Sequence, residues 1–258
     1  MEPTRERAWE TLNRYTKSEA LLRHALAVEA AVGAYAQRFG EDEELWRVTA
    51  LLHDFDYEIH PTLDQHPQDG APILRDEAVT LLEEWVQSES LRRHCYAVEA
   101  AMRAYASKYG ADEELWGVTA LLHDFDYEIH PTLDQHPQDG APILRDEGYP
   151  EVVVEGVLSH GSHLGLPRDT QLKKTLFACD ELAGFVHACG LVRPDGIETL
   201  EPKSVKKKLK QPSFAAGVNR QDVYEGAQEL GVDLGEHISF VVTAMRPIAG
   251  ELGLKTGG

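Results

Sequence analysis

Histidine and acidic residues recur in one block of the chain whose residue types suit a metal ion. The block TALLHDFDYEIHPTLDQHPQDGAPILRDE occurs twice, letter for letter, at residues 49–77 and 119–147. Each copy contains an adjacent His-Asp pair, which is His123-Asp124 in the second copy. Near a helix end, two adjacent side chains can reach one cation. An imidazole with a carboxylate suits a borderline or hard divalent metal, so the block predicts metal chemistry.

A metal site here needs further ligands from other helices. His94 precedes the pair on an expected helix, and Asp180 lies within the apolar segment LFACDELAGF. A carboxylate in such a segment is costly unless it is paired or bound to a metal. The alternative for these side chains is a hydrogen-bonded network in the core.

The elements that must position these residues are expected to be helices. Residues 88–110 have apolar positions spaced by three and four, with Ser88 as a candidate N-cap and Gly110 as a stop. A second helix is expected to begin after Asp112 and to end near the His-Asp pair. Further helices are expected within 136–148, 150–161, 171–190, 219–231 and 233–253, and a loop over 191–204. No segment shows convincing strand alternation, so the predicted fold class is all-α.

The repeat determines the expected domain organisation. At an offset of 70 residues, Ser18 aligns with Ser88 and His24 with His94. We call residues 8–77 copy 1, residues 78–147 copy 2 and residues 148–258 the unique part. The predicted domains are an extra N-terminal copy over 1–77 and a complete domain over 78–258.

The two junctions that follow the copies differ in helix breakers. Copy 2 is followed by Gly148 and Pro150, which end a helix, whereas copy 1 continues into AVTLLEEW with neither. We therefore expect the last helix of copy 1 to run into the first helix of copy 2.

Composition excludes some classes of partner. The formal net charge of -19 argues against non-specific binding to nucleic acid, which depends on lysine and arginine. No apolar run approaches the ~18 residues that a membrane span needs, so no membrane partner is expected. The first residues are charged and lack the apolar segment of a secretion signal, which predicts a cytoplasmic protein.

The ordered set His94, His123-Asp124 and Asp180, with the HPQDGAPIL block, resembles the HD superfamily of metal-dependent phosphohydrolases. The resemblance covers about 88–190 well and part of the tail. It implies an HD-domain helical bundle, here with a duplicated helical segment at the N-terminus, in which these four residues hold a metal ion.

Members of that superfamily with two metals, including the HD-GYP phosphodiesterases, place histidines where this chain has His136 and His160. The resemblance implies that these two bind a second ion and that Asp124 bridges the two. The expected cofactor is one or two divalent transition metal ions, such as manganese, iron, zinc or nickel. The full expected set of ligands is His94, His123, Asp124, His136, His160 and Asp180.

The implied reaction is hydrolysis of a small phosphate ester, for which a nucleotide is one candidate. Some nucleotidase members use an acidic residue shortly after the pair, which makes Asp126 and Glu128 catalytic candidates beside Asp124. The basic residues considered for contact with substrate phosphate are Lys206, Lys207 and Arg220. The chain departs from HDIG-type members, because Asp126 and Tyr127 replace their Gly and Lys. The GYP signature is also absent, which argues against a cyclic-dinucleotide substrate.

Copy 1 repeats part of the site. It supplies the incomplete set His24, His53, Asp54 and His66, but the unique part occurs once, so one complete site per chain is expected, in the contiguous copy 2. A homodimer that exchanges segments is left open. Two other interpretations also remain: a catalytically silent metal- or nucleotide-binding regulatory module, and a duplication product of mainly structural interest.

Overall fold

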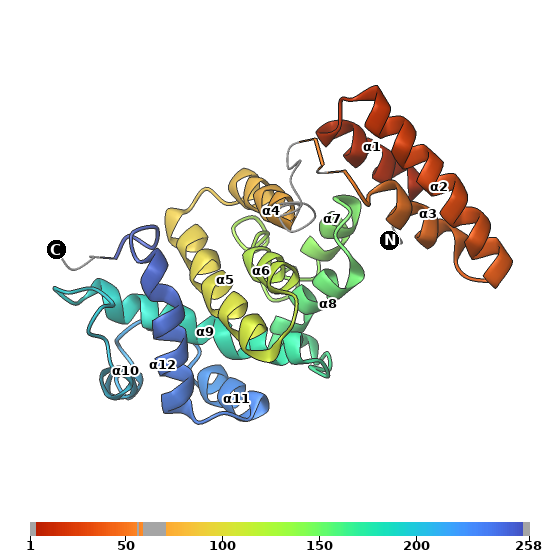
Figure 1. The fold of residues 1–258 in the computed structure, drawn as a ribbon. Coiled ribbons are helices and arrows are strands. Elements are labelled where there is room, and N and C mark those ends of the chain that lie inside the picture. The colour runs from red at the N-terminus through yellow and green to blue at the C-terminus, as the bar shows by residue number, and fades with distance from the viewer. Residues whose placement is uncertain (1–3, 56, 59–70, 255–258) are drawn as a thin grey trace. The chain divides into compact units, whose positions relative to one another are not determined.

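Helices form the fold throughout the part of the chain that the structure describes. The computed structural model describes residues 4–55, 57–58 and 71–254, with 71–74 as backbone alone. Within these ranges there are twelve α-helices and no strand, which confirms the all-α prediction (Figure 1).

The chain divides into two compact units. Unit 1 comprises Met1–Asp76 with Leu144–Glu151, and unit 2 comprises Glu77–Ile143 with Val152–Gly258. Helix α4 (Ala71–Trp85) is continuous across the boundary, as the absence of a helix breaker predicts. The expected domain boundary after Glu77 falls inside α4, and the division into a partial and a complete domain stays a prediction.

Unit 1 contains three helices that pack around a small core. They are α1 (Arg5–Tyr15), α2 (Glu19–Phe39) and α3 (Glu43–Leu51). Thr4 and Asp42 cap α1 and α3 by accepting backbone N–H bonds. The core consists of Ala8, Leu12, Ala25, Val48 and Leu51. Because this core is small, much of α2 stays exposed.

Unit 2 begins with the end of α4 and continues into two helices that match copy 1. Helix α5 (Glu89–Tyr109) begins at Ser88, whose side chain accepts from the backbone of Leu91, and ends at Gly110 in the left-handed conformation. Asp112 caps α6 (Glu113–Leu121). These ends confirm the boundaries predicted from the capping residues.

The next helices lead into the unique part. They are α7 (Gly140–Asp146), α8 (Glu151–His160) and the central α9 (Gln171–Leu191). The end of α7 and the first residue of α8 belong to unit 1. Gly148, with φ of 88°, lies between α7 and α8, as the predicted helix break requires.

Helix α9 packs against α5 and against the three helices of the tail. These are α10 (Pro202–Leu209), α11 (Arg220–Leu230) and α12 (Leu234–Met245). The loop expected over 191–204 is shorter than predicted, because Pro202 occupies a first-turn position of α10. The chain leaves the α-helical conformation after Met245, and Pro247 lies in a 3-10 helix, Arg246–Ile248.

A buried polar contact joins three helices of unit 2. His237 on α12 is fully buried, and its Nε2 donates to the carbonyl oxygen of Ala178 on α9 over 2.9 Å. Its Nδ1 therefore accepts from the hydroxyl of Tyr105 on α5 over 2.7 Å. Both ring nitrogens are satisfied, so the contact is a structural support of the bundle.

Candidate metal centre

Five segments of unit 2 position the six predicted ligands. His94 lies on α5 and Asp180 on α9, while His123 and Asp124 lie in the turn just after α6. His160 is the last residue of α8. His136 precedes α7 and is buried.

The first group joins α5, the turn after α6 and α9. The Nε2 atoms of His94 and His123 lie 3.1 Å apart. Asp180 Oδ1 lies 3.0 Å from the first and 3.4 Å from the second. These three atoms lie close enough together to hold one metal ion.

The second group is formed by His136, His160 and Asp124. The two Nε2 atoms lie 3.2 Å apart, and Asp124 Oδ1 lies 3.2 Å from His136 and 3.4 Å from His160. The other oxygen of Asp124, Oδ2, lies 3.6 Å from His94 and 3.5 Å from His123. Asp124 therefore turns one carboxylate oxygen toward each group.

Hydrogen bonds to backbone carbonyl groups fix the orientation of two of these rings. Nδ1 of His123 lies 2.7 Å from the carbonyl oxygen of Ala120, and Nδ1 of His160 lies 2.6 Å from that of Val157. Because a carbonyl oxygen only accepts, each Nδ1 must donate. In the neutral form of each ring, Nε2 then carries a lone pair toward the centre, as a metal-binding histidine requires.

Burial and charge act in opposite directions on the pKa values of this cluster. Burial disfavours the charged ring, yet the carboxylates of Asp124 and Asp180 raise the pKa of His123 to about 9. Burial also opposes the ionisation of Asp124, but His123 and His136 hold its pKa well below the usual range. The two carboxylates therefore favour a positive charge on the histidine ring that they surround.

The donor set fits a cation. Nδ1 of His136 is 2.8 Å from Asp126 Oδ1, so the ring donates there and its Nε2 also carries a lone pair. When both rings are neutral, this lone pair faces the lone pair of His160 and Asp124 Oδ1, so three acceptors then converge on one point. A divalent ion satisfies all three at once, whereas one proton can join only two of them.

The comparison with known proteins agrees with this geometry. The family model of the HD domain matches residues 21–93 and, again, residues 91–184. The chain belongs to the HD domain family. No solved structure matches the chain. HD domains bind divalent metal ions and are generally metal-dependent phosphohydrolases. Both matches include a His-Asp pair, and only the second reaches Asp180.

Asp126 of the HD centre is aimed at a ligand of the second group. It is fully buried, and its two oxygens accept from His136 over 2.8 Å and from His130 over 3.3 Å. A Cβ built on Gly140 would lie 2.7 Å from Asp126 Cγ, so this position leaves room for the carboxylate. This contact orients the ring of His136, and the catalytic role of Asp126 stays a prediction.

Glu128 has a different local role. Its Oε2 accepts from the backbone N–H groups of Gln87 and Ser88 over 2.8 and 3.0 Å, at the N-terminus of α5. Glu58 in copy 1 makes the same contacts with Lys17 and Ser18. In both copies this carboxylate caps the N-terminus of a helix. The catalytic role of Glu128 stays a prediction.

A pocket of about 380 Å³ opens beside His94 of the HD centre. The turn that follows the His-Asp pair forms one wall with Tyr127 and Pro131, and Leu91 contributes from α5. No lysine or arginine is among its described lining residues. No pattern in the sequence indicates this pocket, because it forms where the turn meets the start of α5.

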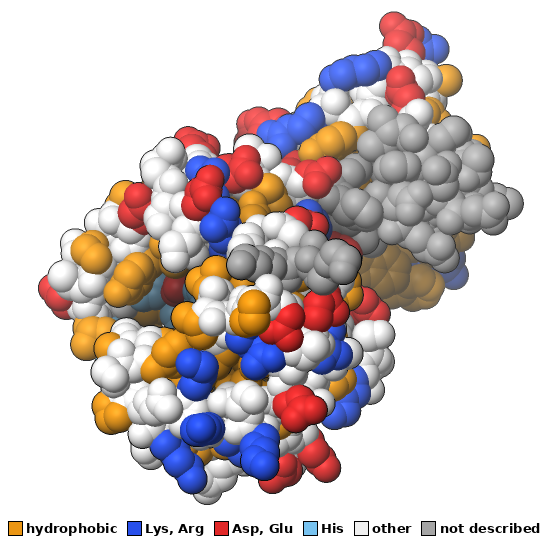
Figure 2. All heavy atoms as spheres, turned by 90° about the vertical axis from the view of Figure 1, so that its left-hand side faces the viewer, with side chains coloured by type: hydrophobic (Ala, Val, Ile, Leu, Met, Phe, Trp, Pro, Cys, Tyr) orange, Lys and Arg blue, Asp and Glu red, His pale blue; other side chains and the backbone are white. Residues whose placement is uncertain are grey.

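The basic candidates lie elsewhere in the HD chain. Basic side chains gather on the lower part of the face drawn in Figure 2. Lys206 and Lys207 lie on α10 and line a second pocket of about 480 Å³. The guanidinium of Arg220 donates to backbone carbonyls of the preceding loop, including that of Val218 over 2.8 Å. Their contact with substrate phosphate stays a prediction.

An acidic residue next to Asp180 on α9, Glu181, was not singled out from the sequence. Burial and, next, the neighbouring Asp180 raise the pKa of Glu181 to about 8. Adjacent carboxylates within an apolar helical segment are the signal that could have indicated it.

Copy 1 brings three of its four predicted residues together. His24, His53 and Asp54 form a third group whose atoms lie close enough to share a metal ion. His66 lies outside the described residues.

None of the described helices combines the length and apolar composition needed to cross a bilayer.

Proposed function

We propose that the chain is a metal-dependent phosphohydrolase that acts on a small phosphate ester, with the reaction centre on copy 2. The observation that carries the proposal is Asp124, whose two carboxylate oxygens face two separate groups of ligands. A carboxylate between two ions is the arrangement of two-metal hydrolytic sites. Membership of the HD family supports the same class of activity.

Six side chains would hold the ions. We assign His94, His123 and Asp180 to one ion, His136 and His160 to the other, and Asp124 to both. Bound divalent ions would supply an activated water molecule and charge to offset the phosphoryl oxygens. Manganese, iron, zinc and nickel all suit nitrogen and oxygen ligands.

The neighbouring residues prepare these ligands. Asp126 holds the proton of His136 on Nδ1, so that Nε2 stays available. The carbonyl groups of Ala120 and Val157 do the same for His123 and His160. These hydrogen bonds therefore select, for three histidines, the neutral tautomer whose Nε2 can bind an ion.

The pocket beside His94 suggests which part of the ester lies there. Its lining combines Tyr127, Leu91 and Pro131 with two serines and Glu128, and none of the described lining residues is a lysine or arginine. Such a surface suits the uncharged organic portion of a phosphate ester, such as a base or sugar, better than a second phosphate. A nucleoside monophosphate is thus one proposed substrate class.

A catalytically silent, metal-binding regulatory module is the second candidate. The observation that favours it is that the residues described around the pocket beside His94 include no lysine or arginine. Phosphoryl transfer commonly depends on such a cation. The two candidates share the metal site and differ only in turnover.

The test combines metal analysis with a hydrolysis screen. Wild-type protein is loaded with manganese, iron, zinc or nickel and assayed on phosphomonoesters, nucleotides and phosphodiesters. Asp124→Ala is compared with Asp54→Ala, the matched change in copy 1. The proposal expects Asp124→Ala to lose tightly held metal and all activity, with Asp54→Ala retaining activity. Tight metal binding without turnover on any substrate would favour the silent module, and no tight metal would reject both.

A further inference from the structure

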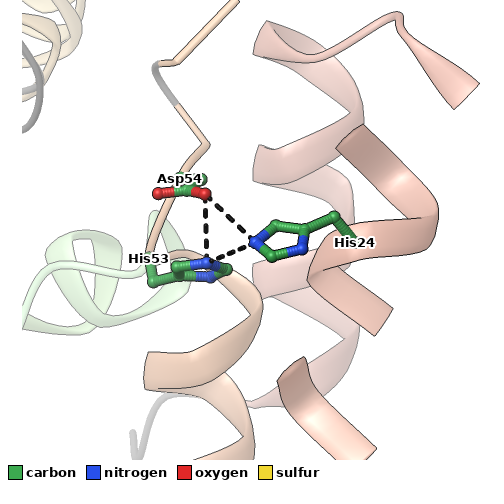
Figure 3. A group of neighbouring side chains, drawn as sticks. All are labelled: His24, His53 and Asp54. Atoms are coloured by element: carbon green, nitrogen blue, oxygen red, sulfur yellow. Dashed lines mark hydrogen bonds and ion pairs between the residues drawn. The ribbon is translucent and has the colours of Figure 1, made fainter. Parts of the chain in front are cut away.

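Copy 1 holds three potential metal ligands in a compact triangle on unit 1 (Figure 3). His24 projects from α2, and His53 and Asp54 follow the end of α3. The Nε2 atoms of the histidines lie 3.2 Å apart. Asp54 Oδ2 lies 3.3 Å from His24 and 3.1 Å from His53. The three distances are nearly equal.

These distances suit one shared ion. Zinc lies ~2.0–2.2 Å from imidazole nitrogen and carboxylate oxygen, and three donors with this spacing would then subtend angles of about 100° at the ion, near the tetrahedral value. Two imidazoles with one carboxylate favour borderline ions such as cobalt, nickel or zinc over magnesium and calcium.

A backbone contact prepares His53 as a ligand. Its Nδ1 donates to the carbonyl oxygen of Ala50 over 2.7 Å. Nε2 of the neutral ring then carries its lone pair toward His24 and Asp54. This hydrogen bond repeats the one that orients His123 in copy 2, where the carbonyl belongs to Ala120.

The groups in the two copies differ in which carboxylate completes the triangle with the two histidines. In copy 2 Asp180 closes the triangle with His94 and His123, and Asp124 is more distant. In copy 1 the carboxylate of the pair itself, Asp54, closes the triangle.

Exposure also distinguishes the two groups. The side chain of His24 is 51% exposed and that of His53 is 31% exposed. The matched values for copy 2 are 20% for His94 and 0% for His123. An ion in copy 1 would therefore face solvent, with coordination positions beyond the three side chains.

We propose that copy 1 carries a second metal site, formed by His24, His53 and Asp54, which is separate from the centre on copy 2. The site binds one borderline divalent transition metal ion and leaves its outer positions to water or to a small anion from solution. It is weaker than the centre on copy 2, by at least about tenfold in Kd, because it lacks the ligand from α9 and the burial of that centre.

Cobalt(II) provides the test, because its visible absorption reports ligation by imidazole. Equilibrium dialysis and titration use the full-length, tag-free chain with excess magnesium, which occupies sites made of carboxylates alone. The wild type is expected to bind cobalt tightly on copy 2 and to bind one further equivalent more weakly. His24→Ala is expected to remove the weaker equivalent and to leave the tight binding and any hydrolysis unchanged. Because His24 is exposed, this variant should fold, which circular dichroism checks.

A second background separates this site from the proposed function. His123→Ala with Asp124→Ala removes ligands from both groups on copy 2. This variant should still bind one weak cobalt ion, and adding His24→Ala should abolish that binding. If the weak equivalent is missing, or survives His24→Ala unchanged, the proposal is overturned. Neither result depends on turnover, so a failure of the hydrolase assignment leaves this test intact.

Discussion

The guanidinium of Arg103 fills the space over Gly117, where a Cβ would lie 2.5 Å from Arg103 Nε. The same guanidinium pairs with the buried carboxylate of Glu99 over 2.8 Å and with Glu114. An arginine on α5 thus covers the buried acid from one side, and the facing helix α6 has a glycine at the point of contact.

Copy 1 reverses this pair. Gly33 occupies the position of Arg103, and Arg47 occupies that of Gly117. A Cβ on Gly33 would lie 2.5 Å from the guanidinium carbon of Arg47. The buried Glu29 lies 3.8 Å from Arg47 and is bonded by Arg5 over 2.6 Å. Both copies therefore place an arginine beside the same buried carboxylate, but from opposite helices.

We predict that this exchange is energetically coupled. Gly117→Arg alone should lower the free energy of unfolding by ~1–3 kcal/mol, because two guanidinium groups compete for one space and Arg103 must leave Glu99. Adding Arg103→Gly should recover most of the loss, since it reproduces the arrangement of copy 1. Urea denaturation of the double-mutant cycle measures the coupling.

The matched cycle in copy 1 is Gly33→Arg with Arg47→Gly. Coupling of the same sign is expected there. If both pairs of single changes simply add, the arginines do not share one space and the interpretation fails.

Asp126→Asn should weaken one metal equivalent selectively. The amide keeps the shape of the side chain but removes the charge that orients His136, so we expect ~10–100-fold weaker binding at the group of His136 and His160. The group around His94 should retain its affinity. Metal titration followed by dialysis measures both, and equal weakening of the two groups would contradict a positioning role.

Glu128→Ala should cost stability without changing metal content. The carboxylate accepts two backbone N–H groups before α5, and loss of such a helix cap costs about 1 kcal/mol. Glu58→Ala removes the matched contacts in copy 1 and should have a similar effect on unit 1. Denaturation and metal analysis are the two readouts, and loss of metal in Glu128→Ala would instead favour a direct role at the centre.

Acid should destabilise unit 2 through His237. Burial lowers its pKa from the ordinary value of 6.5. As the pH falls below about 6.5, the unfolded chain takes up a proton at this histidine while the folded chain does not. The free energy of unfolding should therefore fall with pH, at up to ~1.4 kcal/mol per pH unit from this residue.

The comparison for this prediction is His237→Gln. Denaturation curves between pH 7 and pH 5 should give a shallower dependence for this variant than for the wild type. Identical slopes would show that His237 has the same pKa in both states.

Local signals in the sequence predicted much of the helical framework. Ser88, Gly110 and Asp112 marked helix ends correctly, because capping is decided by a few neighbouring residues. The six expected ligands do come together in unit 2, and their binding of metal stays a prediction. This prediction rested on the order of the ligands along the chain, which resembles that of HD proteins. Their known spatial arrangement indicated which residues would meet.

Contacts between distant segments were not predictable in the same way. Nothing local to Glu128 indicates that it caps a helix that begins forty residues earlier. The basic residue Arg220 suggested phosphate contact, yet its guanidinium is engaged by nearby backbone carbonyls. The loop expected over 191–204 ends earlier than predicted, because Pro202 begins a helix. Each outcome depends on which groups the fold brings together.

The continuity of α4 has a consequence for what would happen if one 70-residue repeat were deleted. The end of α4 in copy 2 and α1 in copy 1 occupy equivalent positions, and each is followed by the same turn and helix. Recombination between these two helices would excise one period of 70 residues and join Arg7 directly to Ala78. The product would keep a helix capped by Thr4 and a single complete set of six ligands. Deletion of one 70-residue period is therefore expected to leave a continuous helix at the join.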